Sequence, residues 1–452
     1  MNKKEQILKL VTEYIQEKHS TKQWIAGKDW VQYAGPYFDS SEYVSAINTL
    51  LNEWLVLGED AIKFEKQFPP LLGKNHGIIT NSGSSANLLM MAAIKSRKLW
   101  NFPKGTKVIV PVAGFPTTLN PILQMEFTPC FVDIEINTLN LNLDQVEALA
   151  SEVKIITFAH VLGNPPNMNK LMEIINKYDM ILLEDCCDAL GSTYNNKPLG
   201  SFGYMASCSF YPAHHITTGE GGFVVCNNKE TEKVLRSLRE WGRGCYCVGK
   251  KANLSKSGTC GKRFNNWIPS IPNEIFDHKY VYEEIGYNLK PIELQCSIGL
   301  QQLNKLPDII HRRKENYKKL FSIFSPYEKF FVLPRKTPNS DPSWFAFPLT
   351  IKDKSPFTRQ QICGFLEDNK IQTRNYFGGN LLLQPAYQGI VAMDYNNSYI
   401  LSENETNIGI KTKFPVATKV MTDTFFLGTS PVITNPQLDY IEEIVNKFLS
   451  TI

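Results

Sequence analysis

Short apolar segments alternate with helix-length segments between residues 75 and 230. The segments HGIIT, TKVIVPV, TPCFVDI, VKIITFAHV and MILLEDC are rich in branched and aromatic residues, which is typical of buried strands. Between them, SSANLLMMAAIKSRKL and MNKLMEIINKY have the apolar spacing of helices. This alternation predicts an α/β fold with a mostly parallel sheet and helices on both of its faces. The predicted strands are 76–80, 106–112, 128–134, 153–161 and 180–186, and the predicted helices are 84–99 and 168–178.

Three regions follow from the pattern along the whole chain. Residues 1–30 are predicted to form a helical extension, because MNKKEQILKLVTEYIQEKHS is amphipathic but lacks the apolar block of a signal peptide. Residues 31–305 are predicted to form a large domain that contains a long functional loop at 245–275, where neither period is present. Residues 306–452 are predicted to form a smaller α/β domain that follows a helical stretch. Its strand and helices lie in SWFAFPLTI, TRQQICGFLEDN and QLDYIEEIVNKFLS.

The composition narrows the class of protein. The 452 residues are 43% hydrophobic and 20% charged, close to the globular average, and no run of about 18 apolar residues predicts a membrane span. We therefore expect a cytoplasmic protein without a membrane partner. The net charge of +4 is not gathered into a basic stripe, which argues against nucleic acid as a partner but is compatible with an anionic small substrate.

The ten cysteines favour metal binding or catalysis over disulfides, since the cytoplasm keeps thiols reduced. Five of them lie in apolar segments, where a buried thiol behaves as a small hydrophobic residue. These five are Cys130, Cys208, Cys226, Cys296 and Cys363.

Two motifs lie at the carboxyl ends of predicted strands, where ligands of such sheets bind. In the motif TNSGSSANLLMM, a predicted helix begins at Gly83, Ser84 and Ser85, so their N–H groups and hydroxyls could hold a phosphate. The alternative is a structural turn, because glycine and serine are also ordinary turn and cap residues. In ILLEDCCDALGS, a strand delivers Glu184 and Asp185. A carboxylate there could pair with a protonated pyridine nitrogen, or it could belong to a solvated acidic turn.

The segment ASCSFYPAHHITTGEGGFVV, residues 206–225, carries the most specific signal. It resembles the lysine motif of sugar aminotransferases, and with the motifs above the chain resembles the DegT/DnrJ/EryC1/StrS family of PLP- and PMP-dependent nucleotide-sugar enzymes over nearly its whole length. The resemblance implies a fold type I PLP-dependent aminotransferase-like architecture, with a mixed, mostly parallel sheet in the large domain. His214 stands at the lysine position. The resemblance then implies that PMP, or PLP, is held noncovalently and that His214 is the catalytic base; the alternative is a structural histidine in a non-catalytic homologue.

The chain resembles one branch in particular, the CDP-4-keto-6-deoxyglucose 3-dehydrases, whose four cysteines hold a 2Fe–2S cluster. The corresponding residues are Cys187, Cys245, Cys247 and Cys260. Twelve residues separate Cys247 from Cys260, an insertion relative to the branch. Cys186 competes with Cys187 for its place, and a zinc site is the alternative use of the four thiolates.

Other residues take roles from the resemblance alone. Phe115 matches an aromatic that stacks on the cofactor ring, Ser209 matches a phosphate-contacting serine, and Asp188 replaces a glutamine or histidine near the ring. Asn288 matches an asparagine that reaches the cofactor phosphate of a neighbouring subunit, which implies a homodimer. The substrate side is expected to include His215, Arg374 and Asn380.

The implied reaction removes the C3 hydroxyl of a nucleotide-linked, CDP-type 4-keto-6-deoxyhexose for 3,6-dideoxysugar and lipopolysaccharide biosynthesis. Electrons would come through the cluster from a separate iron–sulfur flavoprotein reductase or ferredoxin-like donor, because the sequence has no recognisable flavin or nicotinamide motif. The alternatives are a PMP-dependent dehydratase without redox chemistry, and a metal-binding homologue without turnover.

Overall fold

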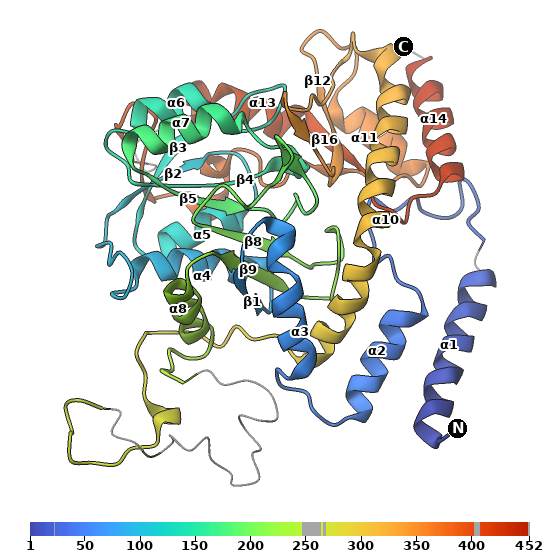
Figure 1. Ribbon diagram of the computed structural model, residues 1–452. Coiled ribbons are helices and arrows are strands. Elements are labelled where there is room, and N and C mark those ends of the chain that lie inside the picture. The colour runs from blue at the N-terminus through green and yellow to red at the C-terminus, as the bar shows by residue number, and fades with distance from the viewer. Residues whose placement is uncertain (22, 246–263, 265–267, 402–406, 451–452) are drawn as a thin grey trace.

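One large sheet organises the protein (Figure 1). The computed structural model describes residues 1–21, 23–245, 264, 268–401 and 407–450. Within these ranges the sheet has nine strands in the order β1-β9-β8-β5-β4-β2-β3-β14-β15. Strand β9 is antiparallel to β1 and β8, β15 is antiparallel to β14, and the strands from β8 to β14 run parallel. The predicted mixed and mostly parallel sheet is confirmed.

All five strands predicted from the hydrophobic pattern are present, each within a few residues of its predicted ends. Strands β1, β2, β3, β4, β5 and β8 point in one direction, so their carboxyl ends meet at one edge. The strand bounds are β1 His76–Thr80, β2 Lys107–Pro111, β3 Thr128–Val132, β4 Ile155–Ala159, β5 Ile181–Asp185, β8 Met205–Ser209, β9 Gly222–Cys226, β14 Val391–Met393 and β15 Tyr399–Leu401.

Helices cover both faces of the sheet because neighbouring strand residues point to opposite sides. Ile78 and Val108 pack under α4, α5 and α8, whereas Ile79 and Ile109 pack with α3, α6 and α7. These helices are α3 Glu59–Gln67, α4 Gly83–Lys95, α5 Pro116–Gln124, α6 Leu143–Leu149, α7 Met168–Tyr178 and α8 Lys229–Arg239.

Helix α4 ends four residues earlier than predicted. The hydroxyl of Ser96 accepts a hydrogen bond from the Lys98 N–H and donates one to Glu284, so local side-chain bonds replace another helical turn.

The cysteines expected in the core largely lie there. Cys130, Cys208, Cys226 and Cys296 are fully buried, and Cys363 is half-buried.

A second, antiparallel sheet of order β10-β12-β16-β13 lies beside the first and packs against α11 and α14. The long helix α10, Glu293–Phe324, runs between the two parts, so the predicted boundary at residues 305 and 306 falls inside a continuous helix (Figure 1). Residues after 306 also extend the large sheet through β14 and β15. Other α-helices and strands are β10 Phe331–Val332, β11 Ser340–Asp341, β12 Ala346–Ile351, β13 Arg374–Asn375, β16 Thr424–Gly428, α11 Arg359–Asp368, α12 Asn407–Lys413, α13 Pro415–Asp423 and α14 Asn435–Leu449. The small strands β6 Thr193–Tyr194 and β7 Lys197–Pro198 form a third sheet with β11, in the order β11-β6-β7.

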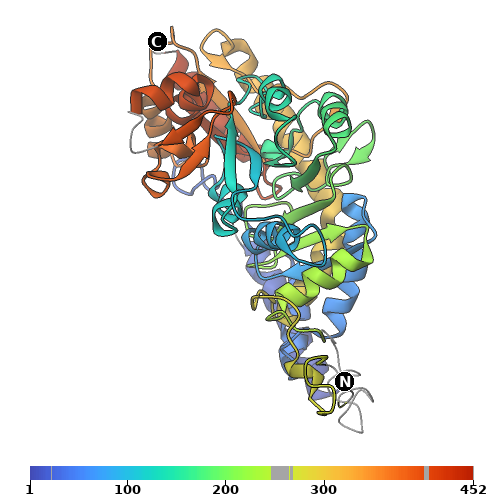
Figure 2. The same cartoon turned by 90° about the vertical axis from the view of Figure 1, so that its left-hand side faces the viewer.

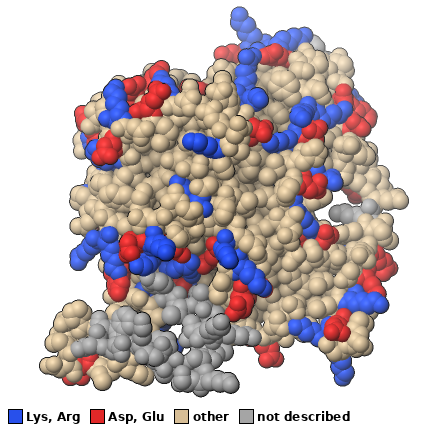
Figure 3. Space-filling view, viewed as in Figure 1, with Lys and Arg blue, Asp and Glu red and all other residues tan. Residues whose placement is uncertain are grey.

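The N-terminal helices lie along one side of the molecule. Helix α1, Lys3–Thr21, packs on α2, Ser40–Leu51, which in turn packs on α10 (Figures 1 and 2). No helix in the described ranges is both long and apolar enough to cross a membrane. Basic and acidic side chains are interspersed over the face seen in Figure 3.

Candidate active site

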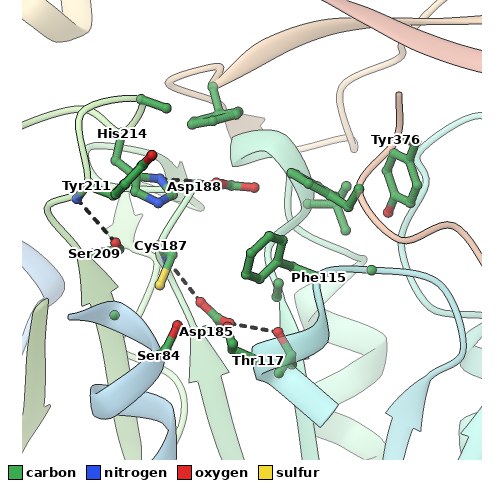
Figure 4. A pocket seen from close by; sticks show the side chains of 18 of the residues that line it. Ser84, Phe115, Thr117, Asp185, Cys187, Asp188, Ser209, Tyr211, His214 and Tyr376 are labelled. Atoms are coloured by element: carbon green, nitrogen blue, oxygen red, sulfur yellow. Dashed lines mark hydrogen bonds and ion pairs between the residues drawn. The ribbon is translucent and has the colours of Figure 1, made fainter. Parts of the chain in front are cut away.

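A cavity of about 800 Å³ lies at the carboxyl ends of the parallel strands, between the two sheets (Figure 4). The large domain contributes the turns after β1, β2, β5 and β8, and the small domain contributes β13 and its neighbours. Residues predicted from separate motifs therefore meet in one place. Those lining the cavity are Gly83, Ser84, Phe115, Asp185, Cys187, Asp188, Ser209, His214 and Arg374.

Asp185 forms the floor of the cavity and is 4% exposed. Its Oδ2 accepts hydrogen bonds from Asn87 Nδ2 and Thr118 Oγ1, each at 2.8 Å, and its Oδ1 accepts one from the Cys187 N–H at 3.1 Å. These three hydrogen bonds hold the carboxylate in one orientation at the cavity floor. Asn87 and Thr118 were not predicted, although both lie within the motifs that supplied Gly83 and Phe115.

Glu184, the preceding residue on β5, faces the opposite side of the sheet. It accepts hydrogen bonds from His160 Nε2 at 2.8 Å, from the Gly200 N–H at 2.9 Å and from the Gly203 N–H. Because strand neighbours alternate, only one carboxylate of the acidic pair reaches the cavity. Glu184 instead ties the chain after β7 to the back of the sheet.

The first turn of α4 offers a cradle for an anion. Ser82 caps the helix, with its Oγ accepting from the Ser85 N–H at 3.0 Å. A Cβ on Gly83 would lie 2.5 Å from Ser209 Cβ, and a Cβ on Gly222 would lie 2.5 Å from the Gly83 nitrogen. Only glycine lets these three segments approach so closely, which leaves helix N–H groups directed at the cavity.

Ser85, the third residue of the predicted phosphate-binding turn, does not line the cavity. Its N–H and its hydroxyl are both hydrogen-bonded to Ser82, so the residue serves the helix cap.

His214 lies in the turn after β8, opposite Phe115 (Figure 4). Its Nδ1 is 3.3 Å from Asp188 Oδ1, and its ring centroid is 5.3 Å from that of Phe345. The backbone of this turn is held by Arg313 of α10, whose guanidinium donates to the carbonyls of His214 at 2.9 Å and of Ala213 at 3.1 Å. Arg313 was not predicted, because it comes from a distant helix.

Aromatic rings form the walls beside His214. Phe115 is 51% exposed, and its ring meets the edge of Phe377 at a centroid distance of 6.0 Å, so one face of Phe115 is open to the cavity. Tyr211 is half exposed on the same side as His214. Among the described residues that line the cavity there is no lysine, and Arg374 is the one permanent cation.

Two residues predicted on the substrate side lie outside the cavity. His215 is buried, with its Nε2 bonded to the carbonyl of Ser343 at 2.9 Å, and burial holds the pKa of His215 well below its usual value. Asn380 is fully buried and donates to Thr418 Oγ1 at 3.2 Å. The His215 side chain is directed toward Ser343, and the Asn380 side chain is directed into the packing against α13.

Arg374 does reach the mouth of the cavity, where its guanidinium lies 4.3 Å from the ring centroid of Tyr33. Asn288 is exposed and does not line the cavity of its own chain.

The two adjacent cysteines after β5 face opposite ways. Cys187 Sγ lies 3.0 Å from the position of a Cβ on Gly83, at the cavity floor, whereas Cys186 is fully buried near Gly200. Burial and the nearby Asp185 carboxylate raise the pKa of the Cys187 thiol. Cys245 Sγ lies 3.0 Å from His278 Nε2. The other two predicted ligands, Cys247 and Cys260, lie outside the described residues.

The residues present fit a pyridoxamine or pyridoxal phosphate. The start of α4 with Ser209 suits a phosphate, the open face of Phe115 suits a planar ring, and the Asp185 carboxylate suits a protonated ring nitrogen.

Comparison with known proteins places this geometry in context. Residues 38–446 match the DegT/DnrJ/EryC1/StrS aminotransferase family. The lipopolysaccharide biosynthesis protein RfbH of Salmonella typhimurium is 40% identical over 450 residues, which cover 99% of this chain and 97% of RfbH. A dTDP-4-dehydro-2,6-dideoxy-D-glucose 3-dehydratase of Saccharopolyspora spinosa is 37% identical over 99% of this chain and 92% of its own.

Among solved structures, the E. coli GDP-4-keto-6-deoxy-D-mannose-3-dehydratase with bound hydrated PLP is similar, with a TM-score of 0.77 and 29% identity. The match covers 92% of this chain and 99% of that chain. The fold type I aminotransferase-like architecture is thereby confirmed.

Proposed function

We propose that this chain, which belongs to the DegT/DnrJ/EryC1/StrS aminotransferase family, is a PMP-dependent enzyme. Its reaction would remove the C3 hydroxyl of a nucleotide-linked 4-keto-6-deoxyhexose. The observation that carries this proposal is His214, which lines the cavity at the motif position where the resemblance leads us to expect a lysine. The similarity to two proteins named as sugar 3-dehydratases supports dehydration over amino transfer.

The phosphate would be held by the first turn of α4 together with Ser209, and the ring would lie between Phe115 and the opposite wall. When bound, PMP supplies an amine that condenses with the sugar ketone and a ring that accepts electrons from its C4′ carbon. Asp185 keeps the ring nitrogen protonated, which is the state that accepts electrons best.

His214 moves the protons. Its imidazole can accept the C4′ proton and then return a proton to the departing C3 hydroxyl, so that water leaves. A histidine cannot bind the cofactor covalently as a lysine does, so noncovalent PMP and loss of transamination follow from the same replacement.

We further propose that reduction follows dehydration, with CDP as the nucleotide. Four cysteines supply the thiolate set of a 2Fe–2S cluster. One of them, Cys187, lies at the cavity floor, and Cys245 begins the segment that carries the other two. Two electrons would come from a separate iron–sulfur flavoprotein reductase or ferredoxin-like protein. The exposure of Asn288 away from its own cavity supports a role toward a second copy of the chain in a homodimer.

The central test uses PMP-loaded enzyme and a panel of CDP-, dTDP- and GDP-linked 4-keto-6-deoxyhexoses. Borohydride reduction after PLP treatment should leave no pyridoxyl adduct on the chain, and His214→Asn should retain PMP but lose C4′ proton exchange with solvent. A stable lysine adduct, or wild-type exchange in His214→Asn, would contradict the proposal.

A second experiment separates the redox reaction from the simple dehydration. Iron per chain and 3-deoxy product should be lost in Cys260→Ser but retained in Cys186→Ser, the matched control whose side chain is buried behind the sheet. C4′ exchange should persist in both variants, because it needs no electrons. Wild-type protein that contains no iron when it is purified without oxygen would favour the non-redox dehydratase.

A further inference from the structure

Asp188 is a buried carboxylate for which the sequence indicated no clear role. It lies three residues after Asp185, is 8% exposed and lines the cavity. Its ion-pair partner among the described residues is His214, whose Nδ1 lies 3.3 Å from Asp188 Oδ1. Figure 4 shows the two side chains facing one another.

The other polar groups around this pair are directed elsewhere. The Arg313 guanidinium is attracted electrostatically by Asp188, but its hydrogen bonds go to backbone carbonyls, at 2.9 Å to His214 and 3.0 Å to Phe345. Burial, together with the negative charge of Asp188, raises the pKa of the buried Tyr376 hydroxyl, so Tyr376 stays a neutral phenol. The charge of Asp188 is therefore available to the imidazole.

We propose that Asp188 is a positioning residue that keeps the proton of neutral His214 on Nδ1 and leaves Nε2 as the proton acceptor facing the cavity. This inference rests on the proposed function. A carboxylate beside one ring nitrogen selects the tautomer and the ring orientation. Nδ1 is buried, while the ring lines the cavity, so Nε2 is the nitrogen that can meet a ligand. At 3.3 Å the pair is a charge contact rather than a hydrogen bond, and catalytic contacts of this kind tighten when substrate binds.

The same carboxylate serves both proton transfers. When Nε2 accepts the C4′ proton, the ring becomes a cation whose Nδ1–H faces Asp188. When the C3–O bond breaks, that proton passes from Nε2 to the leaving oxygen, water forms and His214 returns to its neutral state. Asp188 exchanges no proton in either step. Arg313 holds the backbone of the same turn, so the histidine is fixed at both its ring and its carbonyl.

The first readout is the tautomer itself, measured by NMR on PMP-loaded protein labelled with nitrogen-15 histidine. The chain has seven histidines, and His214→Asn identifies the signal of His214. The wild type should show an unprotonated Nε2, and Asp188→Asn should show a mixture or the opposite tautomer. An unchanged tautomer in Asp188→Asn would overturn the proposal.

The second readout is the rate of C4′ exchange with the same sugar nucleotide panel. Asp188→Asn should slow exchange by about 10²- to 10⁴-fold, as the loss of an orienting carboxylate does in other histidine bases. PMP affinity should change less than about threefold, and Asp188→Glu should recover about tenfold over Asp188→Asn because it restores the charge. Weakened PMP binding in parallel with the rate, or no recovery with glutamate, would show a merely structural role.

Asp394→Asn is the matched control for removal of a buried carboxylate. Asp394 is 2% exposed, contacts Lys413 at 3.1 Å and is not among the residues that line the cavity. It should leave the His214 signal and the exchange rate unchanged. If wild-type enzyme shows no exchange with any sugar nucleotide, the proposed function fails, while the NMR comparison still decides the role of Asp188.

Discussion

Removing the charge of each of two neighbouring residues on β5 in turn should separate an effect on catalysis from an effect on stability. Asp185 and Glu184 are both buried carboxylates, but Asp185 faces the cavity and Glu184 faces the back of the sheet. Asp185→Asn and Glu184→Gln remove the same charge with almost no change in shape. The fold predicts opposite phenotypes for these two variants.

For Asp185→Asn we expect a large loss of activity. A unit charge pair about 4 Å apart is worth about 4 kcal/mol at an effective dielectric constant of about 20, which corresponds to about 10³-fold in C4′ exchange. The new amide group must also point its NH₂ at either Asn87 Nδ2 or the Cys187 N–H, which now donate to the carboxylate. A buried donor left without an acceptor costs about 1–3 kcal/mol, so stability should fall modestly.

For Glu184→Gln we expect the larger loss of stability. The carboxylate accepts from His160 and from the N–H groups of Gly200 and Gly203, and a glutamine can satisfy only part of this set. Breaking a buried charged network of this kind costs about 3–5 kcal/mol. PMP affinity and C4′ exchange per folded molecule should stay near the wild-type values.

Three measurements check this pair: urea unfolding, PMP titration and the loss of deuterium from labelled C4′. An exchange rate for Asp185→Asn within about tenfold of the wild type would show that the Asp185 charge is irrelevant to the chemistry. Loss of exchange in a folded Glu184→Gln variant would contradict a purely structural role for Glu184.

Four further variants, one of them a control, test other parts of the structure. Gly83→Ala would place its methyl group 2.5 Å from Ser209 Cβ, so it should weaken PMP binding and lower the free energy of urea unfolding by about 1–3 kcal/mol. The control Gly364→Ala has open space within α11 and should raise that free energy by about 0.5–1 kcal/mol; equal effects of the two variants would contradict this. Arg313→Met should cost about 3 kcal/mol in urea unfolding, because buried carbonyls lose their donors, and should slow exchange; a wild-type rate would remove its role in holding the histidine turn. Desolvation lowers the pKa of Lys290 from 10.5 to about 8, so between these pH values the unfolded chain holds the Lys290 proton more tightly than the folded protein does. Lys290→Met should therefore be more stable than the wild type at pH 7, and the difference in the free energy of urea unfolding should shrink as the pH rises from 8 to 10.5. A difference that stays constant with pH would contradict this.

Local pattern was enough to predict the sheet and the segments that approach the site. Buried strands are recognisable from runs of consecutive apolar residues, and the predicted ends of the five strands from β1 to β5 lie within a few residues of the observed ends. Because parallel strands end at one edge, motifs far apart in the chain could be expected to meet there. Gly83, Phe115, Asp185, Ser209 and His214 do line a single cavity.

The resemblance to a family, rather than periodicity, assigned the chemistry of those motifs. Histidine at the lysine position and a carboxylate at the end of β5 acquire meaning only when the surrounding residues identify a cofactor site. The same resemblance also suggested His215 and Asn380, whose side chains are buried outside the cavity lining.

Only the tertiary structure decided which member of each adjacent pair faces the cavity and which distant residues support it. Asp185 and Glu184 differ by one position along a strand, so their directions depend on how the whole sheet is covered. Asn87 and Thr118 reach Asp185 from two other strand-to-helix connections, and Arg313 reaches the histidine turn from α10. Such contacts join residues 67 to 99 positions apart, and no local period records them. They exist because packing the helices on the sheet leaves each buried charge in need of a hydrogen-bonding partner.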